Sequence, residues 1–131
     1  MTVAPRLLIA DDEEAIREVL STVFSDAGYE VDRASDGREA LELFRAKRHR
    51  VVVTDLVMPG LDGVALAREV RKLEPDAIVV VLSGSGPEEK EKAVPFPCTA
   101  CVDKPIALST LLQLVQCLDR GRGPSAGVSG E

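Results

Sequence analysis

The run of four strand-forming residues at positions 51–54 (VVVT) constrains the fold of this chain more than any other stretch. It leads into the carboxylate of Asp55, and the turn formers Pro59 and Gly60 follow shortly afterwards. A short apolar, β-branched run bounded in this way indicates a buried strand of a parallel sheet. In open α/β sheets, ligands bind beyond the carboxyl ends of the strands. We therefore expect Asp55 to face a functional site.

A second strand end of this kind lies near the amino terminus, where residues 7–10 (LLIA) run directly into four acids at positions 11–14. Two acidic strand ends in one parallel sheet predict a shared pocket, formed here by Asp11, Asp12 and Asp55. Carboxylates this close together repel one another, so they either raise their pKa values or hold a cation. A hard divalent ion such as Mg2+ suits a site built from oxygen ligands.

Two further predicted strands end in groups that can donate to an anion. Residues 78–82 (IVVVL) end at Ser83, and residues 100–103 (ACVD) lead into Lys104. Phosphoryl transfer to a carboxylate needs a nucleophile, a cation and further donors for the remaining charge. The candidate site therefore consists of Asp11, Asp12, Asp55, Ser83 and Lys104.

These residues lie in four motifs, IADDE at 9–13, TDLVMPGLDG at 54–63, LSG at 82–84 and DKP at 103–105. With these motifs in this order and spacing, the chain resembles the receiver domain of two-component response regulators over residues 5–120. Any one motif alone would be weak evidence. Asp11 and Asp12 could simply belong to the acid-rich first turn of a helix, Ser83 could be a turn residue, and Lys104 could be a solvated lysine.

The resemblance assigns a role to each site residue. It implies that Asp55 takes a phosphoryl group from the phosphohistidine of a histidine kinase or phosphotransfer protein. Mg2+ would be bound directly by Asp12, Asp55 and the backbone carbonyl of Val57, with Asp11 acting through metal-bound water. Lys104 and Ser83 would each contact a phosphoryl oxygen, and the movement of Ser83 would switch contacts with a downstream protein target or an effector domain. Such a chain assists its own phosphorylation and dephosphorylation and is not a turnover enzyme.

Helical patterns alternate with the predicted strands through five repeats. An apolar stripe over residues 14–27 predicts a helix with Ile16, Val19, Leu20, Val23 and Phe24 inward. Residues 29–34 alternate as a half-buried strand near the sheet edge, and Ser35 or Asp36 can cap the next helix, which runs through Arg48. We expect further helices after Gly63, over residues 87–93, and after Pro105 up to Gly121. The last of these helices is expected to have Leu108, Leu111, Leu112, Val115 and Leu118 inward. The pattern predicts a doubly wound (βα)5 α/β fold, and the resemblance implies a flavodoxin-like sheet of order 2-1-3-4-5.

The length, charge and cysteine content of the chain limit its domain organisation, its partners and its location. The 131 residues fit one domain, a receiver over residues 1–120 followed by a Gly- and Ser-rich segment 121–131 that is either a disordered tail or a truncated linker. The net charge of −6 disfavours direct nucleic-acid binding. No apolar run approaches the roughly 20 residues of a membrane helix, and we expect a cytoplasmic protein. An odd set of three cysteines (Cys98, Cys101 and Cys117) predicts reduced thiols.

Several residues are predicted to lie outside the site, or depart from the receiver pattern. His49, between two arginines, is expected to be a solvated loop residue. Cys98 and Cys101 have the spacing of half a zinc site, and structural thiols are the preferred interpretation. Receivers often carry Tyr or Phe where this chain has Cys101. Val57 and Ser85 lie two residues beyond Asp55 and Ser83. The resemblance implies that side chains at these positions tune how water reaches the aspartyl phosphate, as they do in receivers.

Three other functions compete with a working receiver. A flavodoxin-like nucleotide or flavin binder would cradle phosphate with Gly, Ser or Thr, whereas the first loop here holds four acids. A phosphatase with an aspartyl intermediate usually has Asp-x-Asp, whereas Asp55 is followed by Leu56 and Val57. A degenerate receiver could act only as a binding scaffold. The sequence does not separate a single-domain regulator from a receiver cut from a larger regulator or hybrid kinase.

Overall fold

The structure is a computed structural model that describes residues 4–84, 99–104 and 107–121. The described residues form one parallel sheet in the order β2-β1-β3-β4-β5, which confirms the predicted strand order. The strands are β1 (Arg6–Ala10), β2 (Glu30–Ala34), β3 (Val51–Asp55), β4 (Ile78–Ser83) and β5 (Ala100–Asp103). The helices are α1 (Glu14–Asp26), α2 (Gly37–Lys47), α3 (Gly63–Leu73) and α5 (Leu108–Gly121). The predictions for residues 85–98 and 122–131, including the short helix, lie outside the described residues.

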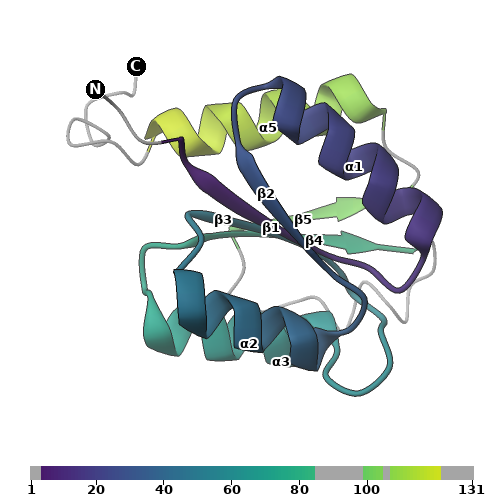
Figure 1. Cartoon of the computed structure of the whole chain (residues 1–131), viewed down its shortest axis with the longest axis vertical. Coiled ribbons are helices and arrows are strands. Elements are labelled where there is room, and N and C mark those ends of the chain that lie inside the picture. Colours follow the sequence, from purple (N-terminus) through teal and green to yellow (C-terminus); the bar gives the residue numbers. More distant parts are fainter. Residues whose placement is uncertain (1–3, 85–98, 105–106, 122–131) are drawn as a thin grey trace.

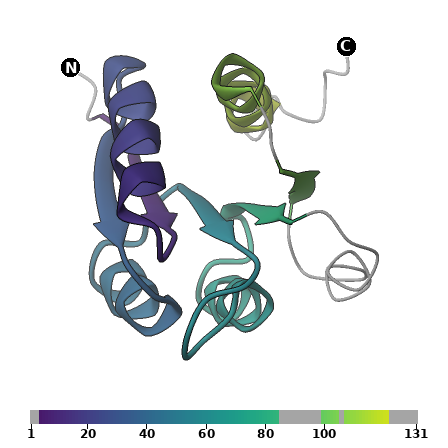
Figure 2. The same cartoon turned by 90° about the vertical axis from the view of Figure 1, so that its right-hand side faces the viewer.

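The helices cover both faces of the sheet. Figures 1 and 2 show α1 and α5 on one face and α2 and α3 on the other. Phe24 of α1 and Val115 of α5 pack on the first face, and Phe44 of α2 and Leu66 of α3 pack on the second. Every residue of β3 and β4 is buried, as expected for central strands that are covered on both sides.

The edge strand β2 and the ends of two helices also follow the sequence pattern. β2 is only partly buried and lies at one edge of the sheet, as its alternating sequence predicts. Asp36, rather than Ser35, caps α2, because its side chain accepts a hydrogen bond of 2.8 Å from the Glu39 amide. Asp62 caps α3 in the same way through the Ala65 amide.

Two residues of the predicted apolar stripe of α1 are not in the core. Leu20 and Phe24 are buried, whereas Ile16 is 36% exposed and Val19 is 45% exposed. The stripe covers a wider arc of the helix than the sheet can cover, so its outer positions remain accessible. Leu108, at the start of α5, is 39% exposed for the same reason. The inward placement predicted for these three residues is therefore wrong.

The prediction that His49 is a solvated loop residue is also wrong. Its side chain is buried, its ring stacks on Phe44, and its Nε2 lies 2.8 Å from Asp32 Oδ2. The cause is the left-handed conformation of Arg48, with φ of 51°, which ends α2 and turns the next side chain back under the sheet edge. Buried histidines require hydrogen-bond partners, and Asp32 supplies one here.

Among the described residues, no helix combines the length and apolar character needed to cross a bilayer.

Candidate functional site

The predicted site residues gather at the carboxyl edge of the sheet. Asp11 follows β1, Asp55 ends β3, Ser83 ends β4 and Lys104 follows β5. All five strands run in the same direction, so their carboxyl ends meet at one edge. The alternation of strand and helix thus brings together residues that are more than 90 positions apart in the sequence.

Asp55 and Lys104 are in direct contact. Lys104 Nζ lies 2.9 Å from Asp55 Oδ1, which also accepts a hydrogen bond of 2.9 Å from the Leu56 amide. Asp55 is only 8% exposed, so water cannot solvate its carboxylate fully. The ion pair with Lys104 and the Leu56 amide stabilise it instead. Burial lowers the pKa of Lys104, but the hydrogen bond and charge of Asp55 outweigh burial and leave that pKa raised. Lys104 therefore remains an ammonium ion at the site.

Asp11 is buried at the base of the acidic loop. Its Oδ1 accepts a hydrogen bond of 2.9 Å from the Glu13 amide, while its Oδ2 is buried and has no hydrogen-bond partner. Burial raises the pKa of Asp11, the hydrogen bond from the Glu13 amide and the charge of Lys104 lower it, and the charges of Asp55 and Asp12 raise it, which leaves the pKa above its usual value. A buried carboxylate oxygen without a partner needs a ligand, and a cation would satisfy it.

The three acidic residues form one cluster. Asp11, Asp12 and Asp55 each offer a carboxylate oxygen, and these oxygens lie within 4.8 Å of one another. Asp12 is exposed, so the cluster opens to solvent on one side. Oxygen ligands in a small group of this kind fit Mg2+, which keeps some of its waters and takes one or two carboxylates from the protein. The residues present therefore fit the predicted metal.

Ser83 is buried at the end of β4, and its hydroxyl is weakly held. Its Oγ lies 3.4 Å from the Gly84 carbonyl oxygen and 3.5 Å from Asp103 Oδ1. Strong hydroxyl hydrogen bonds are shorter, at about 2.5–3.0 Å between oxygens. Little would therefore be lost if the hydroxyl rotated to a better acceptor.

The loop after Asp55 is held close to the strand end. Val57 is 51% exposed, and the loop returns to the sheet at Gly63, whose amide donates to the Leu56 carbonyl oxygen at 2.8 Å. A Cβ atom on Gly63 would lie 2.4 Å from the Asp55 carbonyl oxygen. Glycine is therefore required here for steric reasons, and the close approach fixes the backbone of Asp55.

Comparison with protein families assigns this arrangement. The model of the response regulator receiver domain matches residues 7–116, which include the described site residues. The chain belongs to the response regulator receiver family. This domain is the phosphoacceptor of two-component systems, which confirms the resemblance seen in the sequence.

Individual relatives agree with this assignment. The receiver is 37% identical over 123 residues to response regulator MprA of Mycolicibacterium vanbaalenii, covering 93% of this chain and 53% of that protein. The receiver therefore spans about half the length of this relative. Chemotaxis protein CheY4 of Vibrio cholerae is 34% identical with a TM-score of 0.76, over 88% of this chain and 99% of that one. A receiver domain of a histidine kinase from Syntrophus aciditrophicus is 26% identical with a TM-score of 0.84, over 92% of this chain and 94% of that one.

The structure adds one residue that the sequence analysis did not find. Arg17 of α1 donates a hydrogen bond of 2.7 Å from Nη1 to the carbonyl oxygen of Asp11. Arg17 lies one helical turn beyond Glu13, and this spacing was the only sequence signal for it. The same spacing would be found for a residue with no contact to the acidic loop, so it does not identify Arg17.

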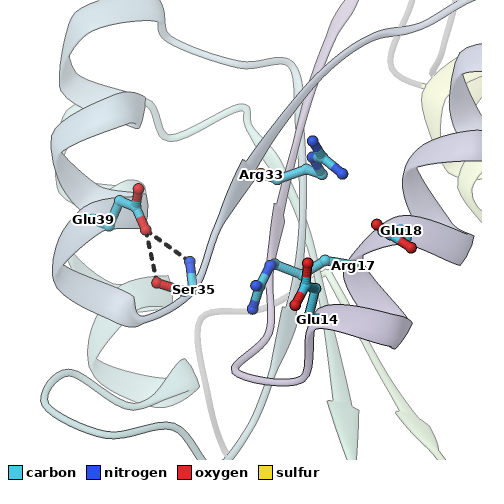
Figure 3. Close-up of a pocket in the computed structure, with 6 residues that line it drawn as sticks. All are labelled: Glu14, Arg17, Glu18, Arg33, Ser35 and Glu39. Atoms are coloured by element: carbon cyan, nitrogen blue, oxygen red, sulfur yellow. Dashed lines mark hydrogen bonds between the residues drawn. The ribbon is translucent and has the colours of Figure 1, made fainter.

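A polar pocket of about 300 Å3 lies next to the acidic loop of the receiver, between the first turns of α1 and α2. Figure 3 shows its lining residues, which are Glu14, Arg17, Glu18, Arg33, Ser35 and Glu39. Ser35 is held by Glu39, whose Oε1 accepts from both the amide and the hydroxyl of Ser35. The two arginines extend into the pocket from α1 and β2, on opposite sides.

Proposed function

We propose that Asp55 is the phosphoacceptor of this receiver, and that its donor is the phosphohistidine of a histidine kinase or phosphotransfer protein. The observation that supports this is the contact of 2.9 Å between Asp55 and Lys104, beside a cluster of three carboxylates. Asp55 alone combines the strand-end position with both the cluster and the lysine. The readout would be altered contact with a downstream protein or an effector domain.

The chemistry is a transfer from nitrogen to oxygen. A carboxylate oxygen of Asp55 attacks the phosphorus, and the bond between phosphorus and the histidine nitrogen breaks. The electron pair of that bond returns to the imidazole, and an acyl phosphate forms on Asp55. The receiver supplies position and charge rather than turnover, because the product stays attached to it.

Mg2+ fits this proposal as the resident cation, and it would neutralise charge on the phosphoryl oxygens. Asp12, Asp55 and the backbone carbonyl of Val57 would hold it directly, and Asp11 would act through bound water. The unpartnered Oδ2 of Asp11 supports a role for this residue at the edge of the metal site.

Lys104 and Ser83 would receive the rest of the phosphoryl charge. Lys104 already lies against Asp55 and would exchange its contact with the carboxylate for a contact with the phosphoryl group. Ser83 would rotate its loosely held hydroxyl toward another phosphoryl oxygen. Moving this buried hydroxyl would change the packing at the end of β4. Phosphorylation of Asp55 would in this way alter the surface that a protein partner contacts.

The phosphodonor is proposed to dock on the apolar groove between α1 and α5. Its lining includes the apolar side chains of Ile16, Leu20, Leu108 and Leu111, together with Lys104. Ile16 and Leu108 are exposed without being covered by described residues. An apolar surface next to the reactive carboxylate suits a partner that must bring a histidine to Asp55. We propose that this happens in the cytoplasm, where the thiols of Cys101 and Cys117 would remain reduced.

Intact-mass measurement after treatment with phosphoramidate tests this function. The receiver should gain the mass of one phosphoryl group with Mg2+ present and little or none after chelation. Asp55→Asn should remove the gain. Asp62→Asn is the matched control, since it removes a carboxylate from the same loop and an asparagine can still cap α3.

An equal mass gain in Asp55→Asn would show that another residue accepts the phosphoryl group. No gain in the unaltered chain, with either phosphoramidate or a phosphorylated histidine donor, would instead indicate a receiver that serves only as a binding scaffold.

A further inference from the structure

We propose that Arg17 is a positioning residue for the metal site: by holding the backbone carbonyl of Asp11, it sets the acidic loop in the geometry that binds Mg2+. This inference rests on the proposed function, since it concerns the same carboxylates. It adds a residue that lies outside the predicted site and does not contact the reacting atoms.

The carbonyl of Asp11 lies where the sheet stops providing partners. The Asp11 amide still donates to the Ala34 carbonyl oxygen of β2 at 3.1 Å, which extends the pairing of the two strands by one residue. The Asp11 carbonyl oxygen has no backbone donor among the described residues. It accepts a hydrogen bond of 2.7 Å from the Arg17 side chain, through Nη1. A charged donor at this distance makes a stronger hydrogen bond than a neutral amide would.

The side chain of Asp11 is held just as closely. Its Oδ1 accepts from the Glu13 amide at 2.9 Å, so the residue is fixed at its amide, its carbonyl and one carboxylate oxygen. The remaining oxygen, Oδ2, is buried and unpartnered. The side chain of Asp12, which follows directly, makes no hydrogen bond or ion pair with the part of the chain that the structure describes. The orientation of both carboxylates therefore depends on the contacts made by Asp11.

Arg17 acts on the loop through geometry. Its guanidinium donates to a backbone carbonyl rather than to a carboxylate, and it forms no ion pair with the described acidic residues of the cluster. The guanidinium reaches back along α1, where the Arg17 amide also donates to the Glu13 carbonyl oxygen at 3.1 Å. The two contacts connect the first turn of α1 to both sides of Asp12. Loss of the guanidinium would leave the Asp11 carbonyl oxygen without this hydrogen bond and would allow the acidic loop to move.

The pocket in Figure 3 offers a matched control. Arg33 of β2 lines the same pocket and carries the same charge, but its side chain makes no hydrogen bond or ion pair with the described residues. Arg33→Ala removes one positive charge near the cluster and leaves the Asp11 carbonyl bonded. Arg17→Ala removes the same charge together with the hydrogen bond. The difference between the two variants isolates the contact.

Two measurements on the unphosphorylated protein test the inference. Calorimetric titration should show Mg2+ affinity lowered about tenfold in Arg17→Ala, the size expected when a residue that orients metal ligands is removed. Arg33→Ala should bind Mg2+ nearly as the unaltered chain does. In metal-free protein, hydrogen exchange at the Glu13 amide should be faster in Arg17→Ala only, because this amide donates to the carboxylate that Arg17 steadies.

Chemical rescue separates positioning from a general loss of stability. Methylguanidinium, at concentrations far below those that unfold proteins, should enter the space left by Arg17→Ala and recover part of the Mg2+ affinity. Unchanged Mg2+ affinity in Arg17→Ala, or equal losses in Arg17→Ala and Arg33→Ala, would overturn the inference. Failure of the unaltered chain to bind Mg2+ would overturn the proposed function, and the exchange of the Glu13 amide would still decide whether Arg17 holds the loop.

Discussion

Lys104 and Asp55 form an ion pair between strands that are not neighbours. Lys104 follows β5 and Asp55 ends β3, with β4 lying between these strands in the sheet, yet Nζ and Oδ1 are 2.9 Å apart. The lysine side chain therefore passes over the end of β4, where Ser83 lies. This contact connects β5 with β3 at the carboxyl edge of the sheet.

Removing that lysine is predicted to tighten Mg2+ binding. Lys104→Ala frees the Asp55 oxygen and takes a positive charge away from the cluster. The gain should be on the order of tenfold, which matches the energy of a partly screened charge pair. Calorimetric titration measures it, with Lys72→Ala as a control because Lys72 is exposed and pairs with Glu69 on α3. Weaker Mg2+ binding in Lys104→Ala would show that the lysine orders the site.

Gly63→Ala is predicted to disturb the site by displacing the backbone of Asp55 and Leu56. The added methyl group would meet the Asp55 carbonyl oxygen at 2.4 Å and Leu56 Cα at 2.9 Å, so the strand end must shift. The free energy of unfolding should fall by about 1–3 kcal/mol, as for other overpacked positions. Urea unfolding measures this, and the rate of phosphoryl gain from phosphoramidate should fall as well. Unchanged values of both would mean that the loop after Asp55 adjusts freely.

The aspartyl phosphate is predicted to decay slowly. Hydrolysis needs a water molecule aligned with the phosphorus, and the half-exposed Val57 has no group to hold one. Val57→Asn should shorten the lifetime, because a positioned polar group can speed such a step. Loss of the phosphorylated mass after donor removal, in Mg2+ buffer, compares the two proteins. A lifetime that is equal or longer in Val57→Asn would assign control of decay to another part of the site.

The stability of the receiver is predicted to fall in mild acid because of His49. Burial lowers the pKa of His49 below its usual 6.5, despite the opposing hydrogen bond with Asp32. The unfolded chain then binds a proton more readily than the folded one, so stability is full above pH 6.5 and falls as the pH drops toward the lower folded pKa. The charged groups that face this ring are Asp32, Lys47 and Arg6.

His49→Gln provides the test, since glutamine can still donate to Asp32 but does not titrate. Urea unfolding between about pH 7.5 and about pH 5 should show a smaller loss of stability in His49→Gln than in the unaltered chain. Asp11 also titrates with a shifted pKa, but it contributes equally to both proteins. Parallel curves for the two proteins would place the acid sensitivity elsewhere.

The gathering of the site residues could be predicted from local sequence patterns, whereas the strand order was implied by the resemblance to receivers and is confirmed by the structure. Asp11, Asp55, Ser83 and Lys104 each lie at the end of a recognisable strand, and parallel strands bring their ends together. His49 and Arg17 could not be placed in this way. The burial of His49 depends on one left-handed residue, Arg48, and the contact of Arg17 depends on where a long side chain turns back. Neither leaves a periodic signal.

The last turn of α5 contacts residues at the amino ends of β2 and β3, on the side of the sheet away from the proposed site. Asp119 forms an ion pair with Arg50 and accepts a hydrogen bond of 2.9 Å from the Tyr29 hydroxyl, whereas Leu108, at the other end of the helix, is exposed beside Lys104. Helix α5 therefore connects the amino ends of β2 and β3, which it contacts through Asp119, with the proposed site, where Leu108 and Lys104 line the same pocket. A displacement of Lys104 on phosphorylation would act on the end of α5 that lies farthest from the Asp119 contacts.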